Sequence, residues 1–459
     1  MACNFASGLR ASGMRSKYLN EQIETIPLQA QRELQQERLR SQVQYLWTHS
    51  AFAREKLESA GAEPGDIRSI EDLSRLPFTL KQELRDSQLR RPPLGDHMAT
   101  AMKNVVRIHS SSGTTGTPSY VGVTAGDDQV WSEAVARAYW AQGLRPDSMF
   151  AMGFSIGFFV GGVPVCNGVN RIGATFLPIG VGSSDRLLTS IASMGADTLA
   201  CTPSYATFLL EYARSKMGID PKKLGLRRLM VGAEPGGGIP EIRKRLQDEW
   251  GAKVTESVGN ADVMPIYGAE CEHQDGSHFL VPDHLILEII DPDSGTVLDI
   301  NGDGIEGEMV FTHLGRQCAP LLRFRSNDRV VVKSSRCPCG RTGLRLVIRG
   351  RTDDMLIVRG VNVWPSAIKD VVTSMRPRTT GELRILLDKP GPSASSPVRI
   401  EVEAGDEMPG NASLKQCLEA LLREKLIFTA SITIVPKGSL PRSEMKAKLI
   451  HKTYESDDQ

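Results

Sequence analysis

The sequence predicts an α/β protein with two domains. A large N-terminal domain (residues 1–350) holds a doubly wound, mainly parallel sheet and a β-rich part, and a small α+β C-terminal domain follows (residues 351–459). Short apolar runs alternate with helix-period segments between residues 105 and 260, which is typical of strand–helix–strand units. Short strands with turns replace this alternation from residue 276 to 332, and a new strand–helix pattern starts after residue 350. A chain of 459 residues is long enough for two cores.

The N-terminal segment is expected to be helical. Residues 19–60 are rich in Gln, Glu, Arg and Leu, with apolar residues at helical spacing, which predicts amphipathic helices. The apolar run at residues 105–108 is expected to be a strand.

The central segment is expected to supply the parallel sheet. Four short runs rich in Val, Leu, Met or Phe predict buried strands at Ser148–Phe154, Ala174–Pro178, Asp197–Cys201 and Arg228–Val231. Helical periodicity predicts helices at Ser183–Met194, Tyr205–Lys216 and Pro240–Trp250. Ligands of such sheets bind beyond the carboxyl ends of the strands, so the site is expected in the loops there.

The later segments predict shorter strands. In the β-rich part they are His284–Ile290, Gly307–Thr312 and Arg329–Val332; in the C-terminal domain, strands Leu383–Leu387 and Val398–Glu403 precede a helix at Ala412–Glu424 and a strand at Ser431–Val435. Residues 299–304 match the first half of a calcium-binding EF-hand loop. However, Val310 stands at the twelfth position and no helices flank the segment, so a β-turn is expected.

Composition excludes several classes of protein. Lys and Arg total 55 against 54 Asp and Glu, and this net charge of +1 argues against a nucleic-acid or membrane-surface partner. No apolar run approaches the roughly 20 residues of a membrane span, and the N-terminus lacks the apolar core of a signal peptide. Eight cysteines in a chain of this size indicate metal binding in a reducing compartment rather than a disulfide framework, so the cytoplasm is expected.

A loop of small and hydroxylated residues follows the predicted strand at 105–108. It consists of Ser110, Ser111, Ser112, Gly113, Thr114, Thr115, Gly116, Thr117 and Pro118. Glycines let the backbone amides turn toward anionic oxygens, and the hydroxyls add donors or a magnesium contact. The Gly-Lys-Ser/Thr of P-loop NTPases is absent. The loop therefore predicts a phosphate-binding segment of another kind, with a solvated turn as the alternative.

Further stretches extend this pattern along most of the chain. They are Leu76–Thr79, Ile108–Pro118, Thr202–Tyr205, Gly232–Pro235, Leu322–Arg325 with Asp328, Cys337–Arg341, Gly350–Met355 continuing to Arg359–Pro365, and Leu440–Lys446. In their order and spacing they resemble the adenylate-forming (acyl-activating) enzyme superfamily, and within it the phenylacetate–CoA ligase family. The resemblance implies that ATP and a carboxylic acid form an acyl-adenylate and pyrophosphate, and that the thiol of coenzyme A then displaces AMP. It also implies magnesium and a mobile C-terminal domain.

The resemblance assigns roles to individual residues. Lys446 would be the catalytic cation between the carboxylate and the α-phosphate, with Lys448 as the alternative, and Asp262 and Thr114 would help to bind magnesium. Asp353 resembles the hinge, and Gly360 and Asn362 the loop that meets coenzyme A. The nucleotide would contact Ser111, Ser112, Gly113, Thr114, Thr115, Gly116, Gly232, Ala233, Glu234, Pro235, Val258, Gly259, Asp328 and Arg351.

The acid is expected to bind in an aromatic slot, which suits an aryl or arylacetic acid. The resemblance places the slot at Phe154, Ile156, Phe158, Phe159, Gly161 and Tyr205. The alternative is that these aromatic residues fill the core.

Cysteine and histidine residues predict a structural zinc site. Cys337 and Cys339 bring two thiolates together, and Cys271 with a nearby histidine supplies two more ligands. Three sulfurs and one imidazole form a closed tetrahedral site without a vacancy for water. The resemblance favours His278; His273, His284 and a set of buried free thiols are the alternatives.

Four positions depart from the family pattern. Asp262 stands where a glutamate is usual and Val258 where an aromatic residue is; Thr117 replaces a common lysine and Met445 a glycine. These departures leave nucleotide binding without turnover open as another function. A separate alternative is the same adenylation with delivery of the acyl group to an acyl carrier protein or an amine. The resemblance also allows a homodimer.

Overall fold

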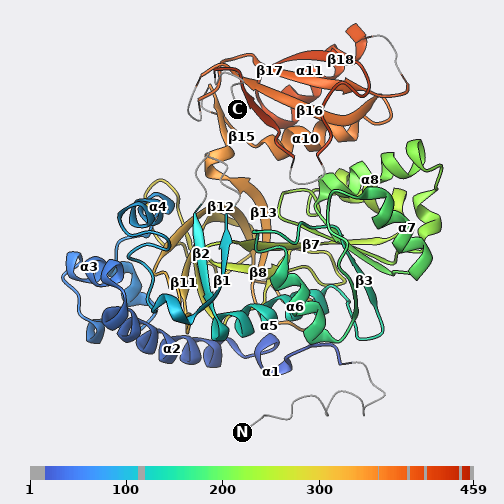
Figure 1. Cartoon of the computed structure of the whole chain (residues 1–459). Helices are drawn as coiled ribbons and strands as arrows, with labels where there is room; N and C mark the ends of the chain where they lie inside the picture. Colours follow the sequence, from blue (N-terminus) through green and yellow to red (C-terminus); the bar gives the residue numbers. More distant parts are fainter. Residues whose placement is uncertain are drawn as a thin grey trace.

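An eleven-stranded sheet organises the larger part of the chain (Figure 1). The computed structural model describes residues 16–111, 119–359, 361–389, 393–407, 411–443 and 447–454. The strand order is β10-β11-β12-β13-β9-β8-β7-β6-β5-β3-β4. The bounds are β3 Met149–Met152, β4 Thr175–Leu177, β5 Thr198–Cys201, β6 Arg228–Gly232, β7 Lys253–Asn260, β8 Met264–Ala269, β9 Ser277–Phe279, β10 Leu285–Ile290, β11 Ile305–His313, β12 Phe324–Lys333 and β13 Arg345–Arg351.

The sheet is parallel on one side and antiparallel on the other. The pairs β3–β4, β3–β5, β5–β6 and β6–β7 are parallel, as the strand–helix alternation predicts. The pairs from β7–β8 to β10–β11 are antiparallel. The β-rich part therefore continues the same sheet, which is mixed as a whole. The predicted α/β class is confirmed.

Helices cover both faces of the parallel half. Leu199 and Val231 pack into one core with α7, α8 and α9, whereas their chain neighbours Ala200 and Met230 pack into a second core with α5 and α6. This alternation follows from the two-residue period of strands, and it explains why these strands are apolar throughout. The helices are α5 Ala125–Ala141, α6 Val163–Ile172, α7 Ser184–Met194, α8 Pro203–Lys216 and α9 Pro240–Trp250.

The N-terminal helices flank the antiparallel half of the sheet. Leu39, Val43 and Leu46 line one stripe of α2 and are fully buried in a core that reaches Ile286 of β10. A two-stranded antiparallel hairpin, β1 Val105–Ser110 and β2 Tyr120–Thr124, carries the predicted phosphate-binding segment at its tip. The helices are α1 Glu21–Glu24, α2 Leu28–His49, α3 Ala51–Ser59 and α4 Lys81–Arg90.

The C-terminal part has its own sheet and core, and it lies above the large sheet next to α8 (Figure 1). The strand order is β18-β17-β16-β19, with β16–β17 antiparallel and the outer pairs parallel. Ile368, Ile385, Ile400 and Leu418 form the centre of its core. The elements are β14 Leu356–Val358, β15 Val361–Val363, α10 Pro365–Ser374, β16 Thr379–Leu387, β17 Val398–Ala404, α11 Asn411–Leu426, β18 Ala430–Val435 and β19 Ile450–Lys452.

Two further expectations concern loops and membranes. Residues 299–304 form the irregular connection between β10 and β11, and Asp303 accepts hydrogen bonds from the amides of Ser334 and Ser335 at 2.8 and 2.9 Å. In the part of the chain that the structure describes, no helix combines the length and the apolar character needed to cross a membrane.

Candidate active site

The two ends of the predicted phosphate-binding segment are held together. The Ser111 amide donates to the Ser119 carbonyl at 2.9 Å, and the two hydroxyls lie 3.0 Å apart. The hairpin β1–β2 thus fixes where the segment leaves and rejoins the protein. Residues 112–118 of the segment lie outside the described residues, and with them Ser112, Gly113, Thr114, Thr115 and Gly116.

Asp262 lies beside these ends, paired with a lysine that the sequence did not single out. Lys81, the first residue of α4, donates to the Ser119 hydroxyl at 2.5 Å and forms an ion pair with the Asp262 carboxylate. The Ser119 hydroxyl donates to the same carboxylate at 3.3 Å. The signal that could have found Lys81 is Leu76–Thr79, which leads directly into α4.

The backbone of Asp262 is fixed independently of its carboxylate. Asp262 lies in the turn between β7 and β8, where its amide donates to the Asn260 side chain at 3.0 Å and its carbonyl accepts from Arg316 at 2.8 Å. Burial lowers the pKa of Lys81, while Asp262 raises it and the cations Arg85 and Arg351 lower it further. Asp262 therefore opposes the lowering of the Lys81 pKa that burial and the neighbouring cations cause.

Asp328 and Arg351 are neighbours on paired strands. They face each other in the register of β12 and β13, and an Arg351 nitrogen lies 3.4 Å from the Asp328 carboxylate. Tyr267 of β8 is fully buried nearby, and its pKa is raised by burial and by the charge of Asp328. The Asp328 carboxylate can accept hydrogen bonds and the adjacent Arg351 guanidinium can donate them, so the pair can bind a ribose or a phosphate.

Glu234 joins three distant parts of the chain. It lies in the turn after β6, where Ala233 has a positive φ of 71°, a conformation that is rare outside glycine. One Glu234 oxygen accepts from the Ser204 amide at 2.8 Å, and the other accepts from the Ala447 amide at 2.6 Å. Ala447 directly follows Lys446, which lies outside the described residues. The chain next to the expected catalytic lysine thus reaches the turn expected to bind the nucleotide.

The β7 end of the site is tightly packed. At Gly232 an added Cβ would lie 2.8 Å from the Ser257 hydroxyl. At Gly259 it would lie 1.8 Å from the Pro265 carbonyl oxygen, so no side chain fits there without a backbone shift. Val258 is half-buried beside it, and Pro235 lies in the loop between β6 and α9. The two glycines set the close approach of neighbouring backbones.

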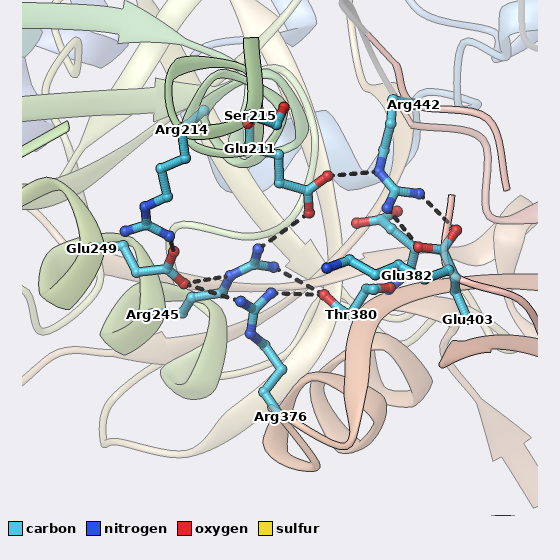
Figure 2. Close-up of polar contacts among 12 residues, drawn as sticks. Glu211, Arg214, Ser215, Arg245, Glu249, Arg376, Thr380, Glu382, Glu403 and Arg442 are labelled. Atoms are coloured by element: carbon cyan, nitrogen blue, oxygen red, sulfur yellow. Dashed lines mark hydrogen bonds and ion pairs between the residues drawn. The ribbon is translucent and has the colours of Figure 1, made fainter. Parts of the chain in front are cut away.

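A polar network joins the C-terminal part to α8 and α9 (Figure 2). Arg442, four residues before Lys446, donates to Glu211 of α8 at 2.9 Å and to Glu403 of β17 at 2.9 and 2.6 Å. Glu403 is fully buried, and its hydrogen bonds raise the pKa of Arg442. The C-terminal part is therefore tied to the large sheet just before Lys446.

The same network continues between α9 and the start of β16. Figure 2 shows Arg245 and Arg376 meeting at the Thr380 carbonyl, which they contact at 3.3 and 2.7 Å. Glu249 of α9 pairs with Arg245 at 2.9 Å and with Arg376 at 3.3 Å. Of these residues, the sequence identified only the stretch that contains Arg442.

The residues expected to form the acyl slot occupy different environments. Ile156 and Phe158 are exposed, and Phe158 is 51% exposed; both lie in the loop beyond the carboxyl end of β3 with Phe159 and Gly161, which are partly exposed. Phe154 packs against the core under α5 and α6. The sixth residue, Tyr205, belongs to α8 and is fully buried, with its hydroxyl 3.0 Å from that of Ser184 in α7.

The expected hinge and coenzyme A residues lie between β13 and β15. Asp353 is in a short 3-10 helix, Thr352–Asp354, that connects β13 to β14. Gly360 lies outside the described residues, and Asn362 is in β15, paired with Ile357.

Cys271, His278, Cys337 and Cys339 come together in a buried cluster. Their potential ligand atoms all lie within 4.8 Å of one another, with Cys271 and Cys337 sulfurs 3.7 Å apart and Cys339 sulfur 3.3 Å from His278 Nε2. Sulfurs that share a tetrahedral zinc ion lie about 3.8 Å apart, given a Zn–S bond of about 2.3 Å. The donor set therefore fits zinc.

Local contacts support this cluster. The Arg341 amide points at the Cys339 sulfur at 3.5 Å, and hydrogen bonding to Cys271 and His278 lowers the pKa of Cys339. Arg341 also forms a buried ion pair with Glu24 at 2.8 Å. His273 and His284 lie elsewhere, paired with Glu272 and Asp283.

Comparison with known proteins identifies the family. The pattern of the family described as "AMP-binding enzyme" matches residues 25–315, and that described as "AMP-binding enzyme C-terminal domain" matches residues 360–453. A phenylacetate–coenzyme A ligase of Thermus thermophilus is 36% identical over 92% of this chain and 96% of its own. The chain belongs to the phenylacetate–CoA ligase family of AMP-binding enzymes. The corresponding Escherichia coli ligase is 33% identical over 93% of this chain and 95% of its own.

Solved structures of a 2-hydroxyisobutyryl-CoA ligase share the architecture. One in the postadenylation state, in complex with R3-HIB-AMP, has 29% sequence identity and a TM-score of 0.89 and covers 96% of this chain and 93% of its own. A structure of the same ligase in the thioesterification state has 30% identity and a TM-score of 0.71 over 95% of this chain and 92% of its own. The whole-chain arrangement is thus more similar to the postadenylation structure.

Proposed function

We propose that this protein activates an aromatic carboxylic acid with ATP and transfers the acyl group to coenzyme A. As a member of this family it is an AMP-forming acid–thiol ligase that uses ATP and coenzyme A. In the first step a carboxylate oxygen attacks the α-phosphorus and pyrophosphate leaves. In the second, the thiol attacks the acyl carbon and AMP leaves.

One contact carries the assignment of the site: the hydrogen bond from the Ala447 amide to Glu234. It supports a position for Lys446 near the nucleotide, where a cation stabilises the charge that develops on the α-phosphate. Asp262 and Thr114 would hold magnesium, whose charge neutralises the phosphates. Asp328 and Arg351 would bind the ribose or a phosphate, and the loop at 154–161 would form one wall of the acid pocket.

The domain boundary and the acceptor side belong to the same proposal. We place the boundary at residue 350, because β13 pairs with β12 of the large sheet while the buried residues from Leu356 onward pack in a separate core. Asp353 would be the hinge, and Gly360 and Asn362 would meet the pantetheine arm. The similarity to the postadenylation structure, which holds an acyl-adenylate, supports the proposal that the present arrangement is the one in which the adenylate forms.

The identity of the acid can be tested by measuring ATP–pyrophosphate exchange with a panel of carboxylic acids in the absence of coenzyme A. Phenylacetate, benzoate and substituted aryl acids are expected to support exchange, and 2-hydroxyisobutyrate, named by a relative, is the aliphatic comparison. Exchange with the aliphatic acid alone would overturn the aromatic assignment. Acyl transfer to a carrier protein or an amine, but not to coenzyme A, would overturn the acceptor.

Lys446 is tested in the same assay. Lys446→Ala is expected to abolish exchange while ATP still binds, and Lys448→Ala, its matched control two residues away, is expected to retain exchange. The reverse pattern would move the catalytic role to Lys448. Unchanged exchange in both variants would contradict a lysine in this role.

We also propose that Cys271, His278, Cys337 and Cys339 hold a structural zinc ion. The ion would connect the loop between β12 and β13 to strand β9 and to the loop after β8. Its closed coordination shell would add folding stability without taking part in the reaction.

A further inference from the structure

We propose that His109 is a positioning residue for the acid, which fixes the loop at 154–161 against the β1–β2 hairpin. This loop is the proposed wall of the acid pocket, and the hairpin carries the predicted phosphate-binding segment. The inference rests on the proposed function and adds a residue to which that function gives no role. His109 acts through the backbone of the loop and touches neither the acid nor the nucleotide.

The tip of the loop is bonded to β1. The Phe158 carbonyl accepts a hydrogen bond from the Ser110 amide at 2.9 Å, and Nδ1 of the buried His109 lies 3.3 Å from the same oxygen. The second strand of the hairpin touches the side chain as well, because the rings of Phe158 and Tyr120 lie 5.7 Å apart. Phe158 is therefore held by both strands of the hairpin.

The surroundings of His109 make Nδ1 the donor. Arg107 Nε lies 2.9 Å from His109 Nε2, and a guanidinium can only donate, so Nε2 must accept. Burial and the positive charge of Arg107 lower the pKa of His109, so the imidazole is neutral near pH 7. Its single proton is therefore on Nδ1, where it can be donated to the Phe158 carbonyl.

Arg107 connects the imidazole to the far end of the loop. It forms an ion pair with Asp128 of α5, and the side-chain amide of Asn167 in α6 donates to the same carboxylate at 3.2 Å. Helix α6 begins at Val163, two residues after the loop ends. The contacts from Asn167 to His109 thus link the helix that follows the loop to the hydrogen bond at its tip.

This arrangement bears on the reaction because one hairpin positions both reactants. Ser111 and Ser119 hold the ends of the phosphate-binding segment, while the preceding residues His109 and Ser110 hold the acid loop. Attack on the α-phosphorus requires the acid and ATP to be aligned, so a displaced loop is expected to weaken productive binding of the acid. Binding of ATP should change little, because the contact between Ser111 and Ser119 does not involve the imidazole.

A role in packing alone is the alternative. The imidazole lies against Trp131, with the ring centroids 5.7 Å apart. Leucine and asparagine have similar sizes and separate the two roles. Leucine packs well against an aromatic ring but has no donor, whereas the asparagine amide can donate to the Phe158 carbonyl from near the position of Nδ1. Packing predicts that His109→Leu is the milder change, and positioning predicts that His109→Asn is.

The test measures the KM values for the acid and for ATP separately, by ATP–pyrophosphate exchange. The acid is the member of the panel that supports the fastest exchange in the unmodified protein. His109→Leu is expected to raise the KM for the acid roughly 3- to 10-fold, as for loss of one hydrogen bond, and to change the KM for ATP less than about twofold. His109→Asn is expected to restore the KM for the acid most of the way to the unmodified value.

Two further variants complete the design. Arg107→Met removes the group that fixes the proton on Nδ1, so it should raise the KM for the acid in the unmodified background but not in His109→Leu. His284→Leu is the matched control, because His284 is also a partly buried histidine but pairs with Asp283 at 3.2 Å. It should leave both KM values unchanged.

A KM is independent of the fraction of molecules that are folded, so a loss of stability does not hide the result. A KM for the acid in His109→Leu that is equal to or lower than that in His109→Asn would overturn the role of His109, as would an equal rise in the KM for ATP. Absence of acid-dependent exchange in the unmodified protein would instead contradict the proposed function, so the two failures are distinguishable.

Discussion

The ion pair between Glu211 and Arg442 provides a sharp test of how the two parts of the chain cooperate. The atoms lie 2.9 Å apart, and Glu211 is 34% exposed. A pair with this exposure contributes up to about 1 kcal/mol, which corresponds to roughly fivefold in an equilibrium constant. Glu211→Gln removes the charge, which also pairs with Arg245 of α9 at 3.6 Å, but it leaves Arg442 bonded to Glu403. It is therefore expected to weaken the docked arrangement without unfolding the C-terminal part.

The assay separates the two half-reactions. With Glu211→Gln, ATP–pyrophosphate exchange is expected to slow by up to about fivefold, because Arg442 lies four residues before Lys446. Thioester formation from a synthetic acyl-adenylate should stay the same or become faster. The matched control is Glu306→Gln, which breaks a pair of similar length, 3.0 Å to Arg329, within the large sheet. Equal slowing of both half-reactions, or no change in exchange, would refute the reasoning.

Three further predictions concern other parts of the molecule. Cys337→Ser is expected to reduce bound zinc from one ion per chain to less than one and to lower the melting temperature, as chelation should in the unmodified protein; an unaltered zinc content would contradict the site. Burial lowers the pKa of His97 to about 4, so the unfolded chain takes up its proton first as pH falls below about 6.5, and stability is lost down to about pH 4. Between pH 7 and pH 5, the free energy of unfolding of His97→Gln should fall by roughly 2 kcal/mol less than that of the unmodified protein, so its urea midpoints at the two pH values should lie closer together. An identical pH dependence of the two proteins would exclude this cause. Gly259→Ala should lower the free energy of unfolding by about 1–3 kcal/mol, because its Cβ would lie 1.8 Å from the Pro265 carbonyl oxygen. Gly65→Ala, whose Cβ would meet open space, should leave the free energy unchanged. Equal urea midpoints of the two variants would contradict the close packing.

Local signals predicted the elements that depend on neighbours in the sequence. The helix predicted at Pro240–Trp250 has the same bounds in the structure, because a proline begins it and Gly251, with a positive φ of 68°, follows its end. The buried strand predicted at Arg228–Val231 is one residue longer. Apolar patterning, with the proline and the glycine at the ends of the helix, was sufficient for both.

Contacts between distant segments were not predictable in this way. The β-rich part extends the parallel sheet because β8 pairs with β7, which no local pattern specifies. Lys81 and Asp262 are 181 positions apart, and Arg442 and Glu211 are 231 apart. The cysteine and histidine cluster was predicted because metal ligands have a recognisable composition, whereas nothing local indicates the distant partner of a single lysine or arginine.

The central claim is tested most directly by ATP–pyrophosphate exchange in the unmodified protein, with an aromatic acid present and coenzyme A absent. The account predicts exchange that requires the acid and magnesium, followed by formation of the aryl-CoA thioester and AMP once coenzyme A is added. Nucleotide binding without exchange, for every acid in the panel, would contradict it.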